Sequence, residues 1–151
     1  KNSAFYLDHI QDPGNFGTIL RIADWFGINT LFTSLESVEL YNPKVLQGSM
    51  GSFLNVQVKQ IEIEKLRLQL PNHHFIGAVM NGMALYQNAE KTKPFILLLG
   101  SESHGFSEGV EALIDERISI PSIGSPIVDS LNVAMACAIL TAELQLNHDR
   151  N

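Results

Sequence analysis

Short apolar runs alternate with longer segments of helical periodicity along this chain, and that alternation predicts an α/β fold. Several of the short runs are apolar throughout, as expected for parallel strands that helices cover on both faces. We therefore expect one parallel sheet flanked by helices on both faces. The predicted strands are Ala4–Leu7, Thr30–Thr33, Asn55–Val58, Phe75–Val79, Phe95–Leu99 and Arg117–Ile120.

Four segments show the periodicity of helices. The first is predicted over Phe16–Phe26 and stops at Gly27, the second begins near Pro43, and the third spans Glu62–Leu70. The last is predicted over Leu131–Asn147 and carries a narrow stripe of apolar and small residues, which would let another backbone approach closely. The stripe consists of Leu131, Met135, Ala138, Ala142 and Leu146.

Composition places the chain among ordinary globular domains. Its 151 residues suggest one domain over 1–151, and 45% hydrophobic against 17% charged residues suffices for a core. No apolar run reaches the roughly 18 residues of a membrane span, and the first residues lack a signal-peptide pattern, so we expect a cytoplasmic protein. The lone Cys137, expected in the core, excludes a disulfide framework within one chain, and the histidines lack metal-ligand spacing, so no metal is predicted.

The net charge of −6 opposes simple binding to a polyanion, because phosphate contacts need Lys or Arg. If RNA is the substrate, the basic groups must be concentrated locally or supplied by another domain. The chain lacks an initiator methionine and opens almost directly into an apolar strand. We expect that an N-terminal part has been removed; a processed start is the alternative.

Glycine, proline, serine and asparagine gather in four places next to predicted strands. These are Asp12–Gly17, Gly48–Ser52, Gly100–Gly109 and Pro121–Pro126. In open α/β sheets, ligands bind in loops beyond the strand ends. These loops are therefore where chemistry is expected.

The first loop, Asp12–Gly17, combines two glycines with a proline, which predicts a rigid turn with special dihedral angles. Asn15 is a good N-cap for the following helix. Arg21 lies off the apolar stripe of that helix. Its simplest interpretation is an exposed pair with Asp24, worth roughly 0.2–0.5 kcal/mol.

The second loop follows a strand that ends at Gly100, where a ligand can approach the backbone closely. Glu102 either braces the loop by accepting hydrogen bonds from its amides or binds a substrate hydroxyl. His104 is either a base or, more simply, a solvent-facing side chain.

The third loop leads into the last predicted helix. Ser130 is suited to cap that helix, which would put Asn132 in the first turn, where free N–H groups and the helix dipole can hold a polar or anionic ligand. The chain contains no phosphate-binding P-loop, HExxH or GxSxG motif.

Taken together, these segments resemble a known family. The strings LDHIQDPGNFGTILRIADWFGI, LLLGSESHGFS and IPSIGSPIVDSLNVAMACAI resemble motifs 1, 2 and 3 of the SpoU RNA 2′-O-ribose methyltransferases, in the SPOUT superfamily. PKVLQGSMGSFLNVQV resembles the segment between motifs 1 and 2. Order and spacing agree over essentially the whole chain.

The resemblance implies a parallel α/β domain with a deep C-terminal trefoil knot, which ordinary topology rules would never predict. It implies S-adenosylmethionine as cofactor, bound in the knot loops, and a homodimer packed around the knot region. Three residues fall at positions that contact the cofactor by this resemblance: Gly100, Ile120 and Leu131. Ala78, at the end of the fourth predicted strand, is expected to be a further neighbour of the cofactor.

The resemblance also implies methyl transfer to a ribose 2′-hydroxyl of tRNA or rRNA, with Arg21 as the central catalytic residue. A guanidinium hardly deprotonates in proteins, so we expect Arg21 to stabilise the developing alkoxide or to orient the ribose, and not to act as a base. The residues that the resemblance sets beside it are Asn15, Glu102, Ser130 and Asn132.

The chain departs from the family at two positions. Gln47 stands where a basic residue is frequent, and the loop Ser122–Asp129 is longer than in common members. Many members also carry an N-terminal RNA-binding domain, for which this chain has no counterpart. Two alternatives stay open: a non-catalytic scaffold with this fold, and an unrelated nucleotide-binding α/β domain.

Overall fold

The computed structural model describes residues 2–84 and 94–146, and its centre is a six-stranded sheet. The strand order is β3-β2-β1-β5-β4-β6, and every pairing within the described residues is parallel. The strands are β1 (Ala4–Leu7), β2 (Thr30–Thr33), β3 (Gln57–Gln60), β4 (His74–Ala84), β5 (Phe95–Leu99) and β6 (Glu116–Ser119).

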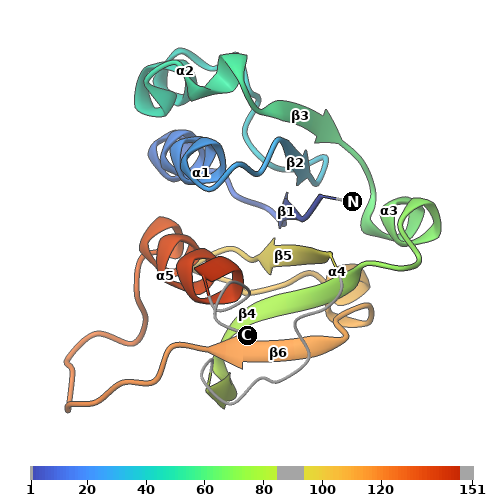
Figure 1. Ribbon diagram of the computed structural model, residues 1–151. Helices are drawn as coiled ribbons and strands as arrows, with labels where there is room; N and C mark the ends of the chain where they lie inside the picture. The colour runs from blue at the N-terminus through green and yellow to red at the C-terminus, as the bar shows by residue number, and fades with distance from the viewer. Residues whose placement is uncertain (1, 85–93, 147–151) are drawn as a thin grey trace.

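Helices cover the sheet on both sides, as Figure 1 shows, with α1, α2 and α5 on one face and α3 and α4 on the other. None of the helices in the described part of the chain is long and apolar enough to cross a membrane. The helices are α1 (Pro13–Trp25), α2 (Pro43–Ser49), the 3-10 helix η1 (Ser52–Leu54), α3 (Ile63–Gln69), α4 (Glu108–Glu111) and α5 (Val133–Leu146).

Two separate cores lie on the two faces of the sheet. Along β1, Phe5 and Leu7 join the core under α1, α2 and α5, whereas Ala4 and Tyr6 join the core under α3 and α4. Successive side chains of a strand point to opposite faces, so a strand buried on both sides must be apolar throughout. The prediction of a parallel sheet between two helical layers is confirmed.

Strands β3 and β4 differ from the prediction in detail. The predicted strand Asn55–Val58 is displaced to Gln57–Gln60 as β3. Strand β4 continues to Ala84, with an irregularity between Ala78 and Met83 where it pairs with β6. The prediction that Ala78 ends its strand is therefore wrong, because pairing with β6 extends β4 beyond its apolar run.

The first helix begins earlier than predicted. Asp12 is its N-cap, since its Oδ1 accepts a hydrogen bond from the Asn15 N–H at 2.8 Å, and Pro13 occupies the first turn. Asn15 therefore lies inside the helix, and its prediction as the cap was wrong. The predicted turn over Asp12–Gly17 is instead the helix start, while the predicted stop at Gly27 is confirmed by a φ of 67°.

The last helix begins later than predicted. Asn132 caps it, because its Oδ1 accepts hydrogen bonds from the N–H groups of Ala134 at 3.0 Å and Met135 at 3.2 Å. The prediction of Ser130 as the cap is wrong. The predicted end at Asn147 lies outside the described residues.

The buried Cys137 belongs to the core under α1, α2 and α5, as predicted. Burial raises the pKa of its thiol to about 12, which leaves it protonated and unreactive at neutral pH.

Helices α1 and α2 meet through two glycines. A Cβ atom on Gly17 would lie 2.8 Å from the Val45 carbonyl oxygen and 2.8 Å from the Gly48 carbonyl carbon, both of which are backbone atoms. A Cβ on Gly48 would lie 3.6 Å from the Gly17 Cα, which is an ordinary contact. The close approach of the two helices therefore requires glycine on α1 only.

We expect Gly17→Ala to lower the free energy of unfolding by about 1–3 kcal/mol, because overpacking exceeds the roughly 1 kcal/mol gained in helix propensity. Gly48→Ala is the matched control and should be neutral or slightly stabilising. Urea denaturation measures both variants; a Gly17→Ala protein as stable as the parent would contradict this packing analysis.

Candidate functional site

Three segments far apart in the sequence meet at the N-terminus of α5. The Asn132 Nδ2 donates hydrogen bonds to the Asn15 Oδ1 at 2.8 Å and to the Glu102 Oε1 at 3.2 Å. These side chains come from the first turn of α1, the loop after β5 and the cap of α5. The structure thus brings together one residue from each of the three sequence motifs.

Glu102 holds the start of α5 directly. Its Oε1 accepts a hydrogen bond from the Val133 N–H at 2.8 Å. A carboxylate is favoured at a helix N-terminus, where N–H groups lack partners inside the helix and the dipole is positive. Glu102 therefore has a structural role: its carboxylate joins the loop after β5 to the start of α5.

The loop that carries Glu102 is tightly closed. Ser101 and Gly105 exchange two backbone hydrogen bonds, of 3.1 Å and 2.9 Å, and Gly105 has a φ of 68°. A Cβ on Gly100 would lie 2.9 Å from the carbonyl group of Gly105. Loop closure by itself therefore demands glycine at Gly100, independently of any ligand.

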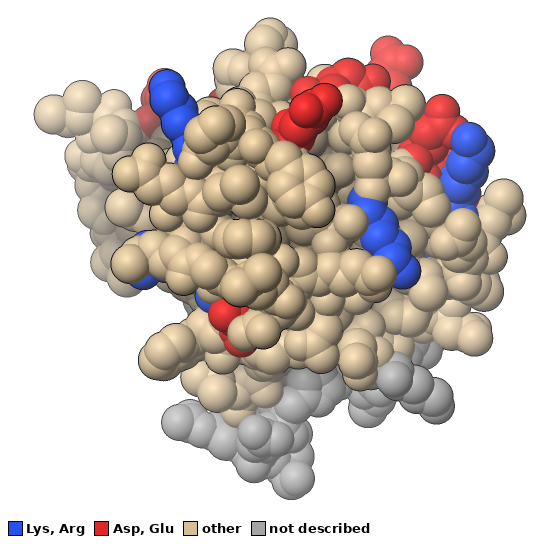
Figure 2. Space-filling view, turned by 90° about the horizontal axis from the view of Figure 1, so that it is seen from above, with Lys and Arg blue, Asp and Glu red and all other residues tan. Residues whose placement is uncertain are grey.

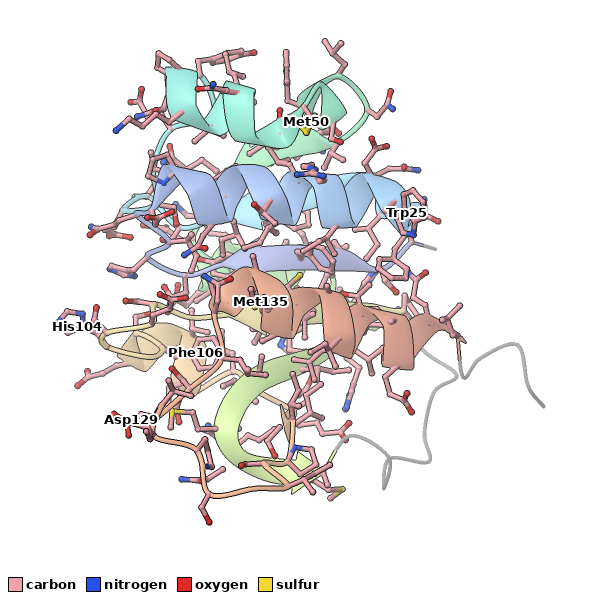
Figure 3. The ribbon with its side chains drawn as sticks, turned by 90° about the vertical axis from the view of Figure 1, so that its left-hand side faces the viewer. Trp25, Met50, His104, Phe106, Asp129 and Met135 are labelled. Atoms are coloured by element: carbon pink, nitrogen blue, oxygen red, sulfur yellow. The ribbon has the colours of Figure 1, made fainter. Side chains whose placement is uncertain are left out.

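His104 lies at the tip of this loop. Its Nδ1 is 2.7 Å from the Ser103 Oγ, and its side chain is exposed. Figure 3 shows His104 pointing outward at the edge of the molecule. The solvent-facing interpretation of this histidine agrees with its position.

Asp8 is a buried anchor that the sequence analysis missed. It is 1% exposed, and its Oδ2 accepts a hydrogen bond of 2.6 Å from the Ser107 N–H, while its Oδ1 accepts one of 3.2 Å from the Ser107 Oγ. The His9 Nδ1 lies 2.8 Å from the same Oδ1. Asp8 thereby ties the end of β1 to the loop that carries Glu102. The sequence did contain a sign of this role, because Asp8 directly follows the apolar strand β1.

Three of the residues expected to contact the cofactor lie on or directly after the neighbouring strands β4, β5 and β6. Ala78 is opposite Ile118 in the β4–β6 pairing, Ile120 directly follows β6, and Gly100 directly follows β5. Ala78 and Ile120 pack partly buried against the core. Leu131 stands apart from them, half exposed just before α5.

The segment between β6 and α5 is open. Residues 121–131 are exposed and, among the described residues, form no backbone–backbone hydrogen bond with one another or with the rest of the chain. Ser130 lies in this segment and is not part of the Asn15–Glu102–Asn132 network. Its backbone groups are available to a bound molecule.

Arg21 also lies outside that network. It is exposed and six residues beyond Asn15 on α1, a rise of about 9 Å. No ion pair joins it to Asp24 within the described residues, so the simple surface-pair interpretation was wrong. Instead, Arg21 lines a hollow of about 470 Å³ together with Asp24, Trp25, Met50 and Ser52.

Acidic, histidine and cysteine side chains do not converge on a possible metal position anywhere in residues 2–84 and 94–146. The candidate site therefore consists of hydrogen-bonding groups at the start of α5, open backbone after β6, and a separate hollow lined by one guanidinium and one carboxylate.

Asp8→Ala should lower the free energy of unfolding by about 2–3 kcal/mol, because it removes a buried charged acceptor and leaves the half-buried donors of Ser107 without a partner. Ser107→Ala, which removes only the weaker hydroxyl hydrogen bond, should cost about 1 kcal/mol or less. Chemical denaturation of both variants tests this difference, and equal losses would contradict the anchoring role of the carboxylate.

Known proteins resemble this chain in sequence. The sequence matches the SpoU rRNA Methylase family over residues 2–142. It is 34% identical to a tRNA/rRNA methyltransferase of Synechocystis, over 91% of this chain and 50% of that protein. It is 29% identical to the 23S rRNA (guanosine(2553)-2′-O)-methyltransferase RlmP of Bacillus subtilis, over 92% of this chain and 56% of that protein.

Solved structures show the same fold. A TrmH-family protein from Porphyromonas gingivalis is 40% identical, with a TM-score of 0.88 over 97% of this chain and 60% of that one. The SpoU methyltransferase AviRb from Streptomyces viridochromogenes, in complex with AdoMet, is 26% identical, with a TM-score of 0.87 over 99% of this chain and 62% of that one. The present chain spans about half the length of the two sequence relatives named above. Because the family match covers nearly the whole of it, the chain belongs to the SpoU rRNA methylase family.

Proposed function

We propose that this chain is the catalytic domain of an RNA 2′-O-ribose methyltransferase that uses S-adenosylmethionine. The observation that carries the proposal is the hydrogen-bonded meeting of Asn15, Glu102 and Asn132, one residue from each family motif.

The cofactor would lie at the ends of β5 and β6 and beside the irregular part of β4, held by Ala78, Gly100, Ile120 and Leu131. The open backbone of residues 121–131 fits this role, because its N–H and C=O groups can pair with an adenine edge. The small or partly buried apolar residues Ala78 and Ile120 suit the flat face of the ring. When bound, S-adenosylmethionine supplies an electrophilic methyl group. The proposal retains the C-terminal trefoil knot that the family resemblance implies.

The chemistry of Arg21 follows from its charge. Its guanidinium stays protonated, so it donates hydrogen bonds and does not accept the proton of the ribose hydroxyl. A fixed donor aimed at the 2′-oxygen stabilises the negative charge that develops there, and positioning supplies much of the remaining rate enhancement. Ser130 would contribute a second polar group from the open segment.

Arg21 is separated from the Asn15–Glu102–Asn132 network within one chain, and a homodimer resolves this separation. The outward face of α5 exposes Met135, Ile139 and Leu146, an apolar stripe without a partner among the described residues. We propose that two copies pack through this face, so that Arg21 of one copy faces the cofactor site of the other.

The RNA substrate, tRNA or rRNA, needs basic contacts beyond Arg21. On the face shown in Figure 2, the Lys and Arg side chains are scattered singly among uncharged residues and form no continuous patch. With a net charge of −6, the chain offers little non-specific attraction for phosphates. We propose that further phosphate contacts come from an RNA-binding domain outside this sequence.

Arg21→Ala should reduce kcat for methyl transfer by about 100-fold or more, because one lost donor at a developing oxyanion typically costs that much. The affinity for S-adenosylhomocysteine should stay nearly unchanged. Transfer of radiolabelled methyl groups to total RNA measures the first, and calorimetry measures the second. Equal turnover in the variant and the parent would refute the role of Arg21.

Arg117→Ala is the matched control, because Arg117 pairs with Glu111 away from the candidate site. Its turnover should equal that of the parent protein. If the full-length protein, with its RNA-binding domain, binds S-adenosylhomocysteine but incorporates no methyl group into any RNA, the chain is a cofactor-binding scaffold. If it binds nucleoside phosphates and not S-adenosylhomocysteine, the unrelated nucleotide-binding alternative holds.

A further inference from the structure

The hollow beside Arg21 is lined by an aromatic side chain that is exposed and does not pack into either core of the protein. Trp25, at the end of α1, is 86% exposed, and Met50, at the C-cap of α2, is 74% exposed. Figure 3 shows the two at the C-terminal half of α1, Met50 above the helix and Trp25 at its end. Large apolar side chains gathered around a hollow indicate a binding surface.

The backbone on the α2 side is shaped to form this hollow. Met50 adopts a left-handed conformation with a φ of 49°, and Gly51 follows with a φ of 90°. These two residues end α2 abruptly and start η1, which brings Ser52 to the same hollow as Arg21. A left-handed residue is an ordinary way to end a helix, and here it sets the wall of the hollow on the α2 side.

The polar groups of the hollow narrow the class of ligand. Arg21 supplies a cation and Asp24 a carboxylate, whose Oδ1 already accepts a hydrogen bond from the Asn55 Nδ2 at 3.2 Å. A phosphate seated here would face the carboxylate of Asp24 and be repelled. A flat nucleobase would stack on the indole and could donate an N–H to Asp24, and unpaired RNA bases are commonly recognised in this way.

The spacing along α1 suits a single nucleotide. Trp25 follows Arg21 by four residues, which places the two side chains on the same face of the helix, about 5–6 Å apart at their Cβ atoms. Ribose and base are neighbours at a similar separation within one nucleotide. A guanidinium that faces the sugar would therefore leave the indole beside the base of the same nucleotide.

We propose that this hollow is the subsite for the unstacked base of the methylated RNA nucleotide, with Trp25 as its stacking platform. Trp25 is then a specificity-determining residue, and Asp24 favours bases that present an N–H donor. This inference rests on the proposed function, because the position of the ribose is taken from the role of Arg21. A second copy of the chain is the competing occupant of the hollow.

Trp25 is the single tryptophan of the chain, so its fluorescence reports on this site alone. We expect a short mixed-sequence single-stranded RNA, titrated into the 151-residue chain saturated with S-adenosylhomocysteine, to quench that fluorescence saturably. Trp25→Ala should weaken the affinity for the RNA, measured by fluorescence anisotropy of labelled RNA, by about ten-fold. Trp25→Phe should retain most of the affinity, and neither variant should change the affinity for S-adenosylhomocysteine.

Leu54→Ala is the matched control, because Leu54 is similarly exposed, at 77%, but does not line the hollow. Its affinity for RNA should equal that of the parent. No saturable quenching at any RNA concentration, or an unchanged RNA affinity in Trp25→Ala, overturns the subsite. A blue shift of the fluorescence that depends on protein concentration without RNA, together with loss of dimers in Trp25→Ala, assigns the hollow to a second copy.

The two proposals fail in different ways. If RNA quenches Trp25 but the parent chain binds no S-adenosylhomocysteine, the hollow is a site for an RNA base, while the methyltransferase proposal and the assignment of that base to a methylated nucleotide both fail. If the parent methylates RNA and Trp25→Ala does so with an unchanged KM for RNA, the methyltransferase proposal stands and the subsite fails.

Discussion

The start of α5 is the point on which the arrangement of the candidate site depends. Three consecutive N–H groups of this helix have side-chain partners: Val133 bonds to Glu102, and Ala134 and Met135 bond to Asn132. The same Asn132 then reaches Asn15 on α1. Because unpaired N–H groups at a helix start are costly, these bonds fix three distant segments relative to one another. Displacing any one of the segments would leave partners of the other two unsatisfied.

The sheet supplies the rigidity that this junction needs. Strands β1 and β5 lie at its centre, covered on both faces, and they continue to pair past their ends, where the Asp8 N–H donates to the Leu99 carbonyl at 2.9 Å. The Asp8 carboxylate then holds Ser107, at the far end of the loop that carries Glu102. A buried carboxylate at one end of this loop and an exposed one within it thus connect the stiffest part of the molecule to α5.

The sequence was most informative where burial alone decides structure. Strands β1, β2 and β5 lie at the predicted positions, because a strand covered on both faces is apolar throughout. Local preference failed at both helix starts. Ser130 and Asn132 are both suitable caps, and the choice depends on Glu102, which lies about 30 positions away in the chain. A four-residue helix such as α4 is too short to show a period.

Long-range partners explain the remaining gaps in the candidate site. Asp8 was missed because its partner Ser107 is 99 positions away in the chain. Gly17 was predicted to lie in a turn because nothing in the neighbouring sequence indicates that it packs against α2. The periodicity of α1 indicated only a surface position for Arg21. Its proposed role came from the family resemblance, which draws on comparisons among many chains that a single sequence does not contain.

The glycine contact between α1 and α2 leaves these two helices no room to slide or separate. The walls of the hollow beside Arg21 belong to α1 and to the turn that ends α2. Because these two elements are packed backbone against backbone, the walls are rigid relative to each other. If the hollow is the proposed base subsite, its rigid walls would require the nucleic acid to change shape on binding. Discrimination would then reflect how readily each nucleotide leaves its neighbours, so a mismatched or looped nucleotide would be accepted before one inside a regular duplex.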